Sequence, residues 1–327
     1  MRVRRWLRRA TLMAACAQLW GCGAKRAADS GTCIVPAYPG GGWDLACRMA
    51  AGALGSLREG GDPMQVMNIA GDGGGVAFAK VVETDRGNER VIVVASPSTL
   101  LGLAQERYGP RTERDVRWIA ATSAEPSVIA VASDAPWHDL HEFVDYWLAH
   151  PDSTIIGGGS PIGGQDHMKM LLLARATGLD VRRVRYRTLN GAPEIVPLLQ
   201  SGTVQVYPGD VSKVQPYVAR GELRVLAVLG EHRMTGLLAN VPTAREQGYD
   251  LAFVIWRGFY APPGISDSAY EHWVDRLHGM SESPAFAAEL ERNGLTPFYL
   301  GGEDFEKFVM EETANYRKVS RSIGLIQ

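Results

Sequence analysis

Short apolar runs typical of buried strands alternate along the chain with segments whose apolar positions recur at helical spacing. The run VIVVA, at Val91–Ala95, is apolar at every position, as expected for a parallel strand covered on both faces. Glycine, proline and polar residues separate the runs, so each run predicts one strand. The predicted strands are Cys33–Ala37, Gln65–Ile69, Val91–Ala95, Ser127–Ala132, Thr154–Gly157, Val184–Tyr186, Val204–Tyr207, Leu223–Leu229 and Gly258–Ala261.

Helical spacing occupies the segments between these strands and most of the C-terminal part. Ser268 and Glu271 fit a capping box that opens a helix running to about Gly279. A second C-terminal helix is expected over Pro284–Asn293, closed by Gly294. The last segment carries Phe305, Phe308, Val309, Tyr316, Val319 and Ile323 at helical spacing, which predicts a helix docked on a core. The helices predicted between strands are Trp43–Leu57, Leu140–Ala149, Gln165–Ala176 and Pro193–Gln200.

Alternating strands and helices predict an α/β fold with mostly parallel sheets flanked by helices. Three glycine-rich segments follow predicted strands, at Pro39–Asp44, Gly71–Gly75 and Gly157–Asp166. Ligands of open α/β sheets bind beyond the carboxyl ends of the strands. We therefore expect two α/β domains with a ligand cleft between them.

The N-terminus has the pattern of an export signal. Residues 1–21 place five arginines, and no acidic residue, ahead of the apolar run ATLMAACAQLW, which is too short to span a bilayer. Leu19 and Gly21 precede Cys22 as in a bacterial lipoprotein signal, which makes Cys22 the lipidation candidate; a similar but weaker pattern ends at Cys16. The expected location is the periplasm, with a membrane anchor through Cys22.

Charge argues against nucleic acid as a partner. Without residues 1–21 the chain keeps 29 basic and 36 acidic residues, a net charge of −7. Proteins that bind polyanions usually carry the opposite sign.

Two cysteines, Cys33 and Cys47, remain beyond the signal and lie on either side of the first glycine segment. In an oxidising compartment such a pair often forms a disulfide, which here would join the first strand to the first helix. The alternative is two buried thiols that act as small apolar groups. No second pair of Cys or His accompanies them, so a zinc site is not expected.

The glycine segments favour anion binding by neutral groups. The first N–H groups of a helix lack intrahelical acceptors and lie at the positive end of the helix dipole. Gly40–Gly42 lead into one predicted helix, and Gly163–Gly164 lead into another, so both segments offer such donors. Hydroxyl donors lie close by in sequence, at Ser96, Ser98, Thr99 and Ser160. Close helix–sheet packing is the structural alternative for any one of these segments.

Signatures of nucleotide-binding and hydrolytic enzymes are absent. No glycine segment completes the dinucleotide fingerprint, no GxxxxGK[ST] occurs, and Ser160 lacks the second glycine of a nucleophile elbow. An enzyme that uses Asp166 and His167 as an acid–base pair is the main alternative function. His138 and His141 have helical metal-site spacing but no accompanying ligands, so neither a metal nor another cofactor is expected.

A set of motifs in the same order resembles one family. The segments CIVPAYPGGGWDLACR, GGGSPIGGQDHMK, VQVYPGDVS, LRVLAVLGEHR, VPTAREQGYD and IWRGFYAPPG together resemble the periplasmic solute-binding receptors of tripartite tricarboxylate transporters, the Bug family, and most closely its tricarboxylate-receptor branch. The resemblance runs from about Cys33 to the C-terminus.

The resemblance implies a two-domain fold of the type II periplasmic-binding-protein kind. Residues 22–128 and 253–327 would form the first domain and residues 129–252 the second, with chain crossings near Ser127–Asp134 and Ala252–Ala261. The function implied is capture of a citrate-like di- or tricarboxylate, without cofactor or catalysis, by a monomer that delivers it to the membrane permease subunits. A ligand sensor for a membrane signalling partner is a further alternative.

The resemblance also implies that both glycine segments hold a ligand carboxylate, often through ordered water, and that Asp210 lies at the same site. Combined with the neighbouring hydroxyl groups, this gives one set of candidate residues. The candidate ligand-binding residues are Pro39, Gly40, Gly41, Gly42, Trp43, Asp44, Ser96, Ser98, Ser160, Gly163, Gly164, Gln165 and Asp210.

Overall fold

The computed structural model describes residues 31–56 and 64–327. The predicted signal peptide (residues 1–21) and the lipidation candidate Cys22 lie outside the described residues. Within the described part of the chain, no helix is both long enough and apolar enough to cross a membrane.

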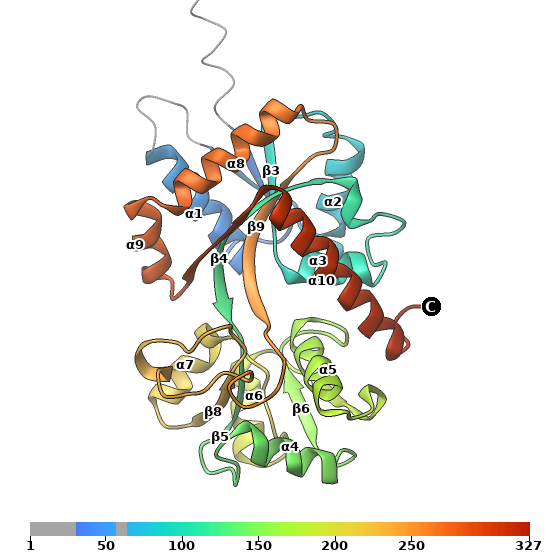
Figure 1. The fold of residues 1–327 in the computed structure, drawn as a ribbon, viewed down its shortest axis with the longest axis vertical. Coiled ribbons are helices and arrows are strands. Elements are labelled where there is room, and N and C mark those ends of the chain that lie inside the picture. The colour runs from blue at the N-terminus through green and yellow to red at the C-terminus, as the bar shows by residue number, and fades with distance from the viewer. Residues whose placement is uncertain (1–30, 57–63) are drawn as a thin grey trace, which may run out of the picture.

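The elements form two groups, one above the other in Figure 1. The upper group contains a six-stranded sheet in the order β10-β4-β9-β3-β1-β2. β1 pairs in parallel with β2 and β3, whereas the β3–β9, β9–β4 and β4–β10 pairs are antiparallel. The strands are β1 (Thr32–Val35), β2 (Gln65–Asn68), β3 (Val91–Ala95), β4 (Arg117–Pro126), β9 (Val254–Ala261) and β10 (Thr296–Gly301).

Helices cover both faces of this sheet, because alternate residues of its strands point to opposite sides. Ile92 and Val94 of β3 pack with the helices α1, α8 and α9, whereas Val91 and Val93 pack with α2, α3 and α10. The helices are α1 (Gly42–Ser56), α2 (Gly75–Glu83), α3 (Pro97–Ala104), α8 (Asp267–Ser281), α9 (Pro284–Arg292) and α10 (Gly302–Ser322), with 3-10 turns at Asp72–Gly74 and Glu113–Asp115.

The lower group is built around two strand pairs, antiparallel β5–β8 and parallel β6–β7. The segment predicted as a strand at Val204–Tyr207 joins them through single bridges, Val206 to Ile156 and Tyr207 to Ala130. The elements are β5 (Val128–Ala132), β6 (Ile155–Gly158), β7 (Arg185–Thr188), β8 (Leu223–Val228), α4 (Leu140–Ala149), α5 (Gln165–Thr177), α6 (Ala192–Gln200) and α7 (Val211–Ala219), with 3-10 turns at Val181–Arg183 and Gly236–Leu238.

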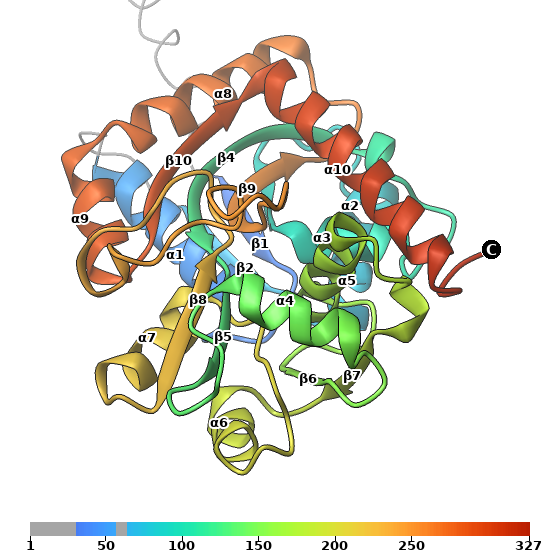
Figure 2. The ribbon, with the colours of Figure 1, turned by 60° about the horizontal axis from the view of Figure 1, so that its bottom comes forward.

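Two strands carry the chain between the groups. The chain descends along β4 into β5 and returns from Phe253 into β9 (Figure 1). At the crossing, the Ser127 N–H donates to the Phe253 carbonyl over 3.2 Å, and the Leu229 N–H donates to the Ser127 carbonyl over 2.7 Å. Beside the crossing, α5 of the lower group contacts α3 and α10 of the upper group (Figure 2).

The α/β architecture with two domains is confirmed, but the expectation of mostly parallel sheets was wrong. The main sheet is mixed because β4 leaves the upper group and β9 re-enters it beside β4, so the two strands must run in opposite directions. The strands β4 and β10 were missed by the sequence analysis. The capping box at Ser268 was also wrong, since Ser266 caps α8 by accepting from the Ala269 N–H over 3.2 Å.

Candidate functional site

The first glycine loop lies exposed between β1 and α1. Gly40 has φ +92°, a conformation that suits glycine, and its N–H donates to Asp44 Oδ2 over 3.0 Å. The buried Asp44 carboxylate also accepts from the Arg48 guanidinium and from Asn68 Nδ2. The hydrogen bond from Arg48 is the main reason that the pKa of Asp44 falls to about 2. The Asp44 carboxylate therefore holds the loop in shape.

A disulfide fixes the two ends of this loop. Cys33 in β1 and Cys47 in α1 are bonded, with their Cα atoms 5.8 Å apart. Gly41 and Gly42 are exposed at the start of α1, and a Cβ on Gly41 would meet nothing within 4 Å. Because the first N–H groups of a helix have no intrahelical acceptor, the loop offers open backbone donors to an anion.

Ser96 connects the first loop to the end of β3. The Trp43 indole N–H donates to Ser96 Oγ over 3.0 Å, and the same oxygen accepts from the Ser98 N–H over 3.3 Å as the N-cap of α3. The buried Ser96 thus orients Trp43, while Ser98 lies half-buried in the first turn of α3.

The second glycine loop uses most of its donors internally. The Gly163 N–H donates to His167 Nδ1 over 3.0 Å, and the Gly164 N–H donates to the Pro161 carbonyl over 2.8 Å. The Asp166 N–H donates to Ser160 Oγ over 3.0 Å. This loop therefore offers an anion fewer backbone donors than the sequence led us to expect, and its half-exposed groups are Ser160 and Gln165.

Asp166 and His167 hold the second loop in the same way. Asp166 accepts from the Gly159 N–H over 2.8 Å and from Lys169 Nζ over 2.9 Å. His167 stacks on Tyr186 at 4.6 Å, and burial lowers its pKa to about 4. A neutral ring whose Nδ1 already accepts a hydrogen bond is poorly placed as a general base.

Asp210 lies at the centre of a buried ionic cluster that the sequence did not reveal. Its carboxylate accepts from Lys169 Nζ and from Lys213 Nζ, each over 2.7 Å. Burial alone would raise the pKa of Asp210, but the two ammonium groups outweigh burial and hold that pKa below its usual value. Lys169 links Asp210 to Asp166, so the cluster supports the second loop from beneath.

Arg257 of β9 was also missed by the sequence analysis. Gly258, the next residue, pairs with Ala95 at the end of β3, which brings Arg257 to the level of the first loop. A Cβ on Gly42 would lie 2.6 Å from Arg257 Nη2. The guanidinium thus packs against the N-terminus of α1. The signal available in the sequence was a single basic residue in a strand that is otherwise apolar.

The third glycine segment has a packing role. The Tyr108 hydroxyl donates to the Gly73 carbonyl over 2.8 Å, and Cβ atoms on Gly74, Gly75 or Gly102 would all lie within 3.0 Å of the Tyr108 ring or hydroxyl. These glycines make room for Tyr108, so this segment does not extend the candidate site.

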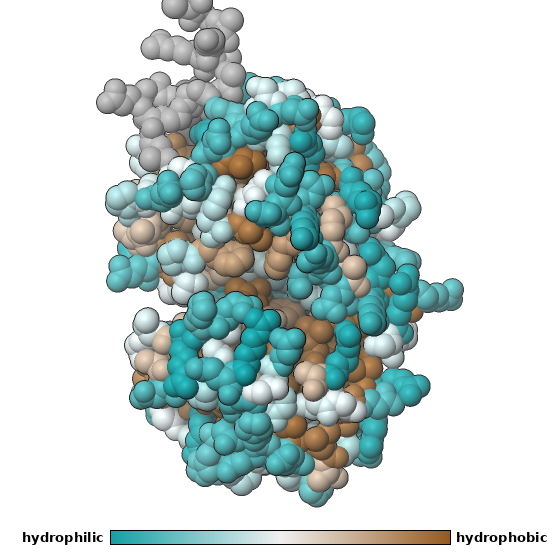
Figure 3. All heavy atoms as spheres, viewed as in Figure 1, coloured by the Kyte–Doolittle hydropathy of each residue, from teal (hydrophilic) through white to brown (hydrophobic). Residues whose placement is uncertain are grey.

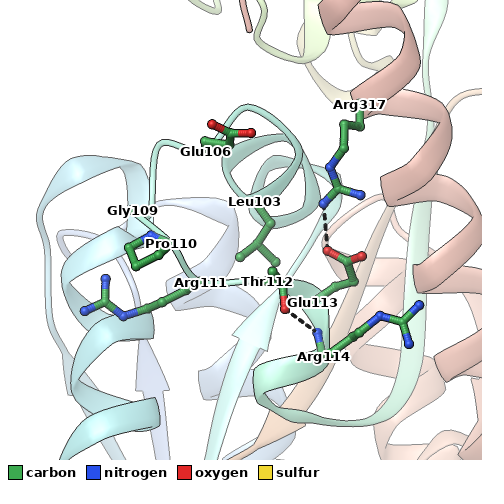
Figure 4. A pocket seen from close by; sticks show the side chains of 9 residues that line it. All are labelled: Leu103, Glu106, Gly109, Pro110, Arg111, Thr112, Glu113, Arg114 and Arg317. Atoms are coloured by element: carbon green, nitrogen blue, oxygen red, sulfur yellow. Dashed lines mark hydrogen bonds and ion pairs between the residues drawn. The ribbon is translucent and has the colours of Figure 1, made fainter. Parts of the chain in front are cut away.

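A pocket of about 650 Å³ lies between α3, the turn after it and α10, and its lining includes no residue of the three glycine segments (Figure 4). Arg317 pairs with Glu113 over 2.9 Å, and Arg111 pairs with Glu83. Because these guanidinium groups are already neutralised, the pocket is a weaker candidate for an anion than the first loop. A hollow also separates the two domains on the surface (Figure 3).

Comparison with known protein families assigns the chain to a family. Residues 48–325 match the model described as the tripartite tricarboxylate transporter family receptor, TctC. The chain belongs to this family. TctC receptors are periplasmic solute-binding proteins that serve a tripartite transporter and bind small carboxylates.

Known relatives cover nearly the whole chain. A UPF0065 protein of Bordetella pertussis is 25% identical over 292 residues, covering 89% of this chain and 88% of that protein. A TctC solute-binding protein from Polaromonas, solved without ligand, has a TM-score of 0.75 at 24% identity, covering 89% and 98% of the two chains.

Two solved structures with a similar fold contain bound ligands. MatC of Rhodopseudomonas palustris, with bound malate, has a TM-score of 0.66 at 21% identity and covers 89% and 98% of the two chains. Rpa4515 of R. palustris, with adipate, has a TM-score of 0.70 at 21% identity and covers 90% and 97%. At this identity the likeness shows the shared TctC fold.

Proposed function

We propose that this TctC receptor captures a citrate-like di- or tricarboxylate between its two domains and delivers it to the membrane permease subunits of a tripartite transporter. The observation that carries the proposal is the first glycine loop, which is held by Asp44 and a disulfide yet keeps its own glycines exposed at the start of α1. Such a loop binds a carboxylate without net positive charge on the protein.

The ligands of the fold neighbours agree with this proposal. MatC contains malate and Rpa4515 contains adipate, and both are dicarboxylates. In this chain Trp43, Ser96 and Ser98 would line the domain-one side of the site. Ser160, Gln165 and Asp210 would line the facing side, with Asp210 acting through its hydrogen bonds to the lysines.

The test is thermal unfolding of the mature protein with a panel of small carboxylates. A ligand at about 100 times its dissociation constant adds roughly 2.7 kcal/mol to the free energy of unfolding, which raises the midpoint measurably. We expect a shift with citrate or a related polycarboxylate and none with monocarboxylates. No shift with any acid would contradict the proposal.

The variant Gly41→Val tests whether the first glycine loop binds the ligand. Its Cβ enters open space, so the fold is expected to persist while the branched side chain blocks access to the first N–H groups of α1. The variant should lose the ligand-induced shift entirely. Gly52→Val is the matched control, because Gly52 is exposed on the same helix, away from the loop, and has the same open space. Retained binding in Gly41→Val would remove the loop from the site.

We also propose domain boundaries near residues 128/129 and 252/253, where Ser127 and Phe253 meet. The mature receptor is proposed to be a monomer anchored in the membrane through a lipidated Cys22. Mass spectrometry of the mature N-terminus tests the anchor, and a mature chain without lipid on Cys22 would exclude it.

A further inference from the structure

The guanidinium of Arg257 lies at the first glycine loop, against the N-terminus of α1. Among residues 31–56 and 64–327, no hydrogen bond or ion pair involves this side chain, although it is half-buried. A charged group withdrawn from water and left without acceptors is costly. Guanidinium has five N–H donors and stays protonated at any physiological pH. The arrangement therefore calls for an anion.

The nearby carboxylates do not meet this need. Glu125 and Asp210 interact with Arg257 only through their charge. Glu125 accepts from the Ser212 N–H over 2.7 Å, and Asp210 is held by Lys169 and Lys213. Both oxygens of Asp210 and Oε1 of Glu125 thus already accept from other donors, and neither carboxylate forms a hydrogen bond or ion pair with the guanidinium within the described residues.

Gly42 is what allows the guanidinium to approach the loop. A Cβ at this position would lie 2.6 Å from Nη2, so any side chain there would displace the guanidinium from its place at the loop. The three glycines of the loop thus have different roles. Gly40 adopts the positive φ of the turn, Gly41 leaves open space in front of the helix N-terminus, and Gly42 makes room for Arg257. The first backbone N–H groups of α1 and the guanidinium of Arg257 therefore lie side by side.

We propose that Arg257 is a specificity-determining residue that binds a second carboxylate of the ligand while the N-terminus of α1 binds the first. This inference rests on the proposed carboxylate-receptor function. Neutral N–H groups suffice for a single carboxylate, whereas a bidentate guanidinium beside them favours a ligand with two adjacent anionic groups. Arg257 thus selects dianions and trianions over monoanions.

Calorimetric titration of the full mature protein with malate, adipate, citrate and butyrate tests this assignment. Arg257→Gln should weaken binding of the polycarboxylate that wild type prefers by at least about thirtyfold, because one buried charge-assisted contact is lost. Butyrate, which can engage only the N-terminus of α1, should bind both proteins equally weakly, so the preference for polycarboxylates shrinks by the same factor. Arg257→Lys should retain part of the affinity, since it keeps the charge without the fork.

Controls separate the possible failures. Arg114→Gln removes an exposed positive charge at the pocket between α3 and α10 and should leave ligand binding unchanged. The midpoint of thermal unfolding without ligand shows whether each variant is folded. If wild type binds a polycarboxylate and Arg257→Gln binds it equally well, the role of Arg257 is overturned and the receptor function stands. If wild type binds none of the acids, the receptor function falls and the assignment of Arg257 falls with it.

Discussion

Lys169 is completely buried, and its ammonium group contacts two carboxylates and two backbone carbonyls. Burial alone would lower the pKa of Lys169, but Asp166 and Asp210 outweigh burial and raise that pKa. The lysine is therefore charged, and the two carboxylates beneath the second glycine loop, Asp166 and Asp210, share it as their cation. A helical lysine in the sequence MKMLLL gives no sign of this position, because the partner Asp210 is 41 residues away.

Replacing Lys169 by methionine should destabilise the protein strongly. Methionine fills a similar volume but leaves Asp166 and Asp210 without their shared cation, which should lower the free energy of unfolding by about 3–5 kcal/mol. Guanidinium chloride unfolding measures the loss. Lys213→Met is the matched control, since the Lys213 side chain is 58% exposed and water can replace it. Equal losses in the two variants would refute a special role for the buried lysine.

At the scale of elements, the disulfide between β1 and α1 restrains the loop that carries the proposed site. Changing both Cys33 and Cys47 to serine should lower the free energy of unfolding by about 2–4 kcal/mol, because the unfolded chain is no longer constrained. The looser loop should also bind carboxylate more weakly. Chemical unfolding and titration measure the two effects, with circular dichroism as the control for folding. Unchanged affinity would show that Asp44 alone holds the loop.

Element prediction succeeded where apolar runs were strong and failed where neighbours decide. β3 was predicted from its apolar sequence alone, and the structure places it at Val91–Ala95 as expected. β4 was missed because its centre, AATSA, is rich in residues with low strand propensity. Its place between β9 and β10 makes it a strand, and that place is set by residues far away in the chain.

The candidate site shows the same contrast between residues that are close in sequence and residues that strand pairing brings together. The first loop was predictable because its glycines, cysteines and Asp44 are close in sequence. Arg257 was not, since its approach to Gly42 depends on the pairing of β9 with β3. Glycine content alone does not identify a binding loop, because Tyr108 fills the space beside Gly74 and Gly75.

At the scale of the whole molecule, Gln105, which directly follows α3, links the two domains by a hydrogen bond. Its Nε2 donates to the Gly163 carbonyl over 2.6 Å and to Ser320 Oγ over 3.3 Å. The variant Gln105→Leu should therefore favour a more open arrangement. Without ligand, its radius of gyration by X-ray scattering should exceed that of wild type.

Added carboxylate should return the Gln105→Leu scattering curve toward that of wild type, because a ligand held by both domains opposes opening. Gln215→Leu, exposed on α7, is the matched control and should scatter like wild type. Identical scattering from all three proteins would mean that this contact does not govern the domain arrangement.

Strand β9 lies close to both the domain crossing and the first glycine loop. Phe253, just before the strand, contacts Ser127 at the crossing between the domains, and Arg257 lies four residues later at the first loop. A bound anion that pulls on Arg257 would thus act on a strand that joins the two domains. With the role proposed for Arg257, one short stretch of the gene encodes both the selectivity of the site and a link between the domains, so a mutation that changes the preferred acid is expected to change the response of the domains to ligand as well.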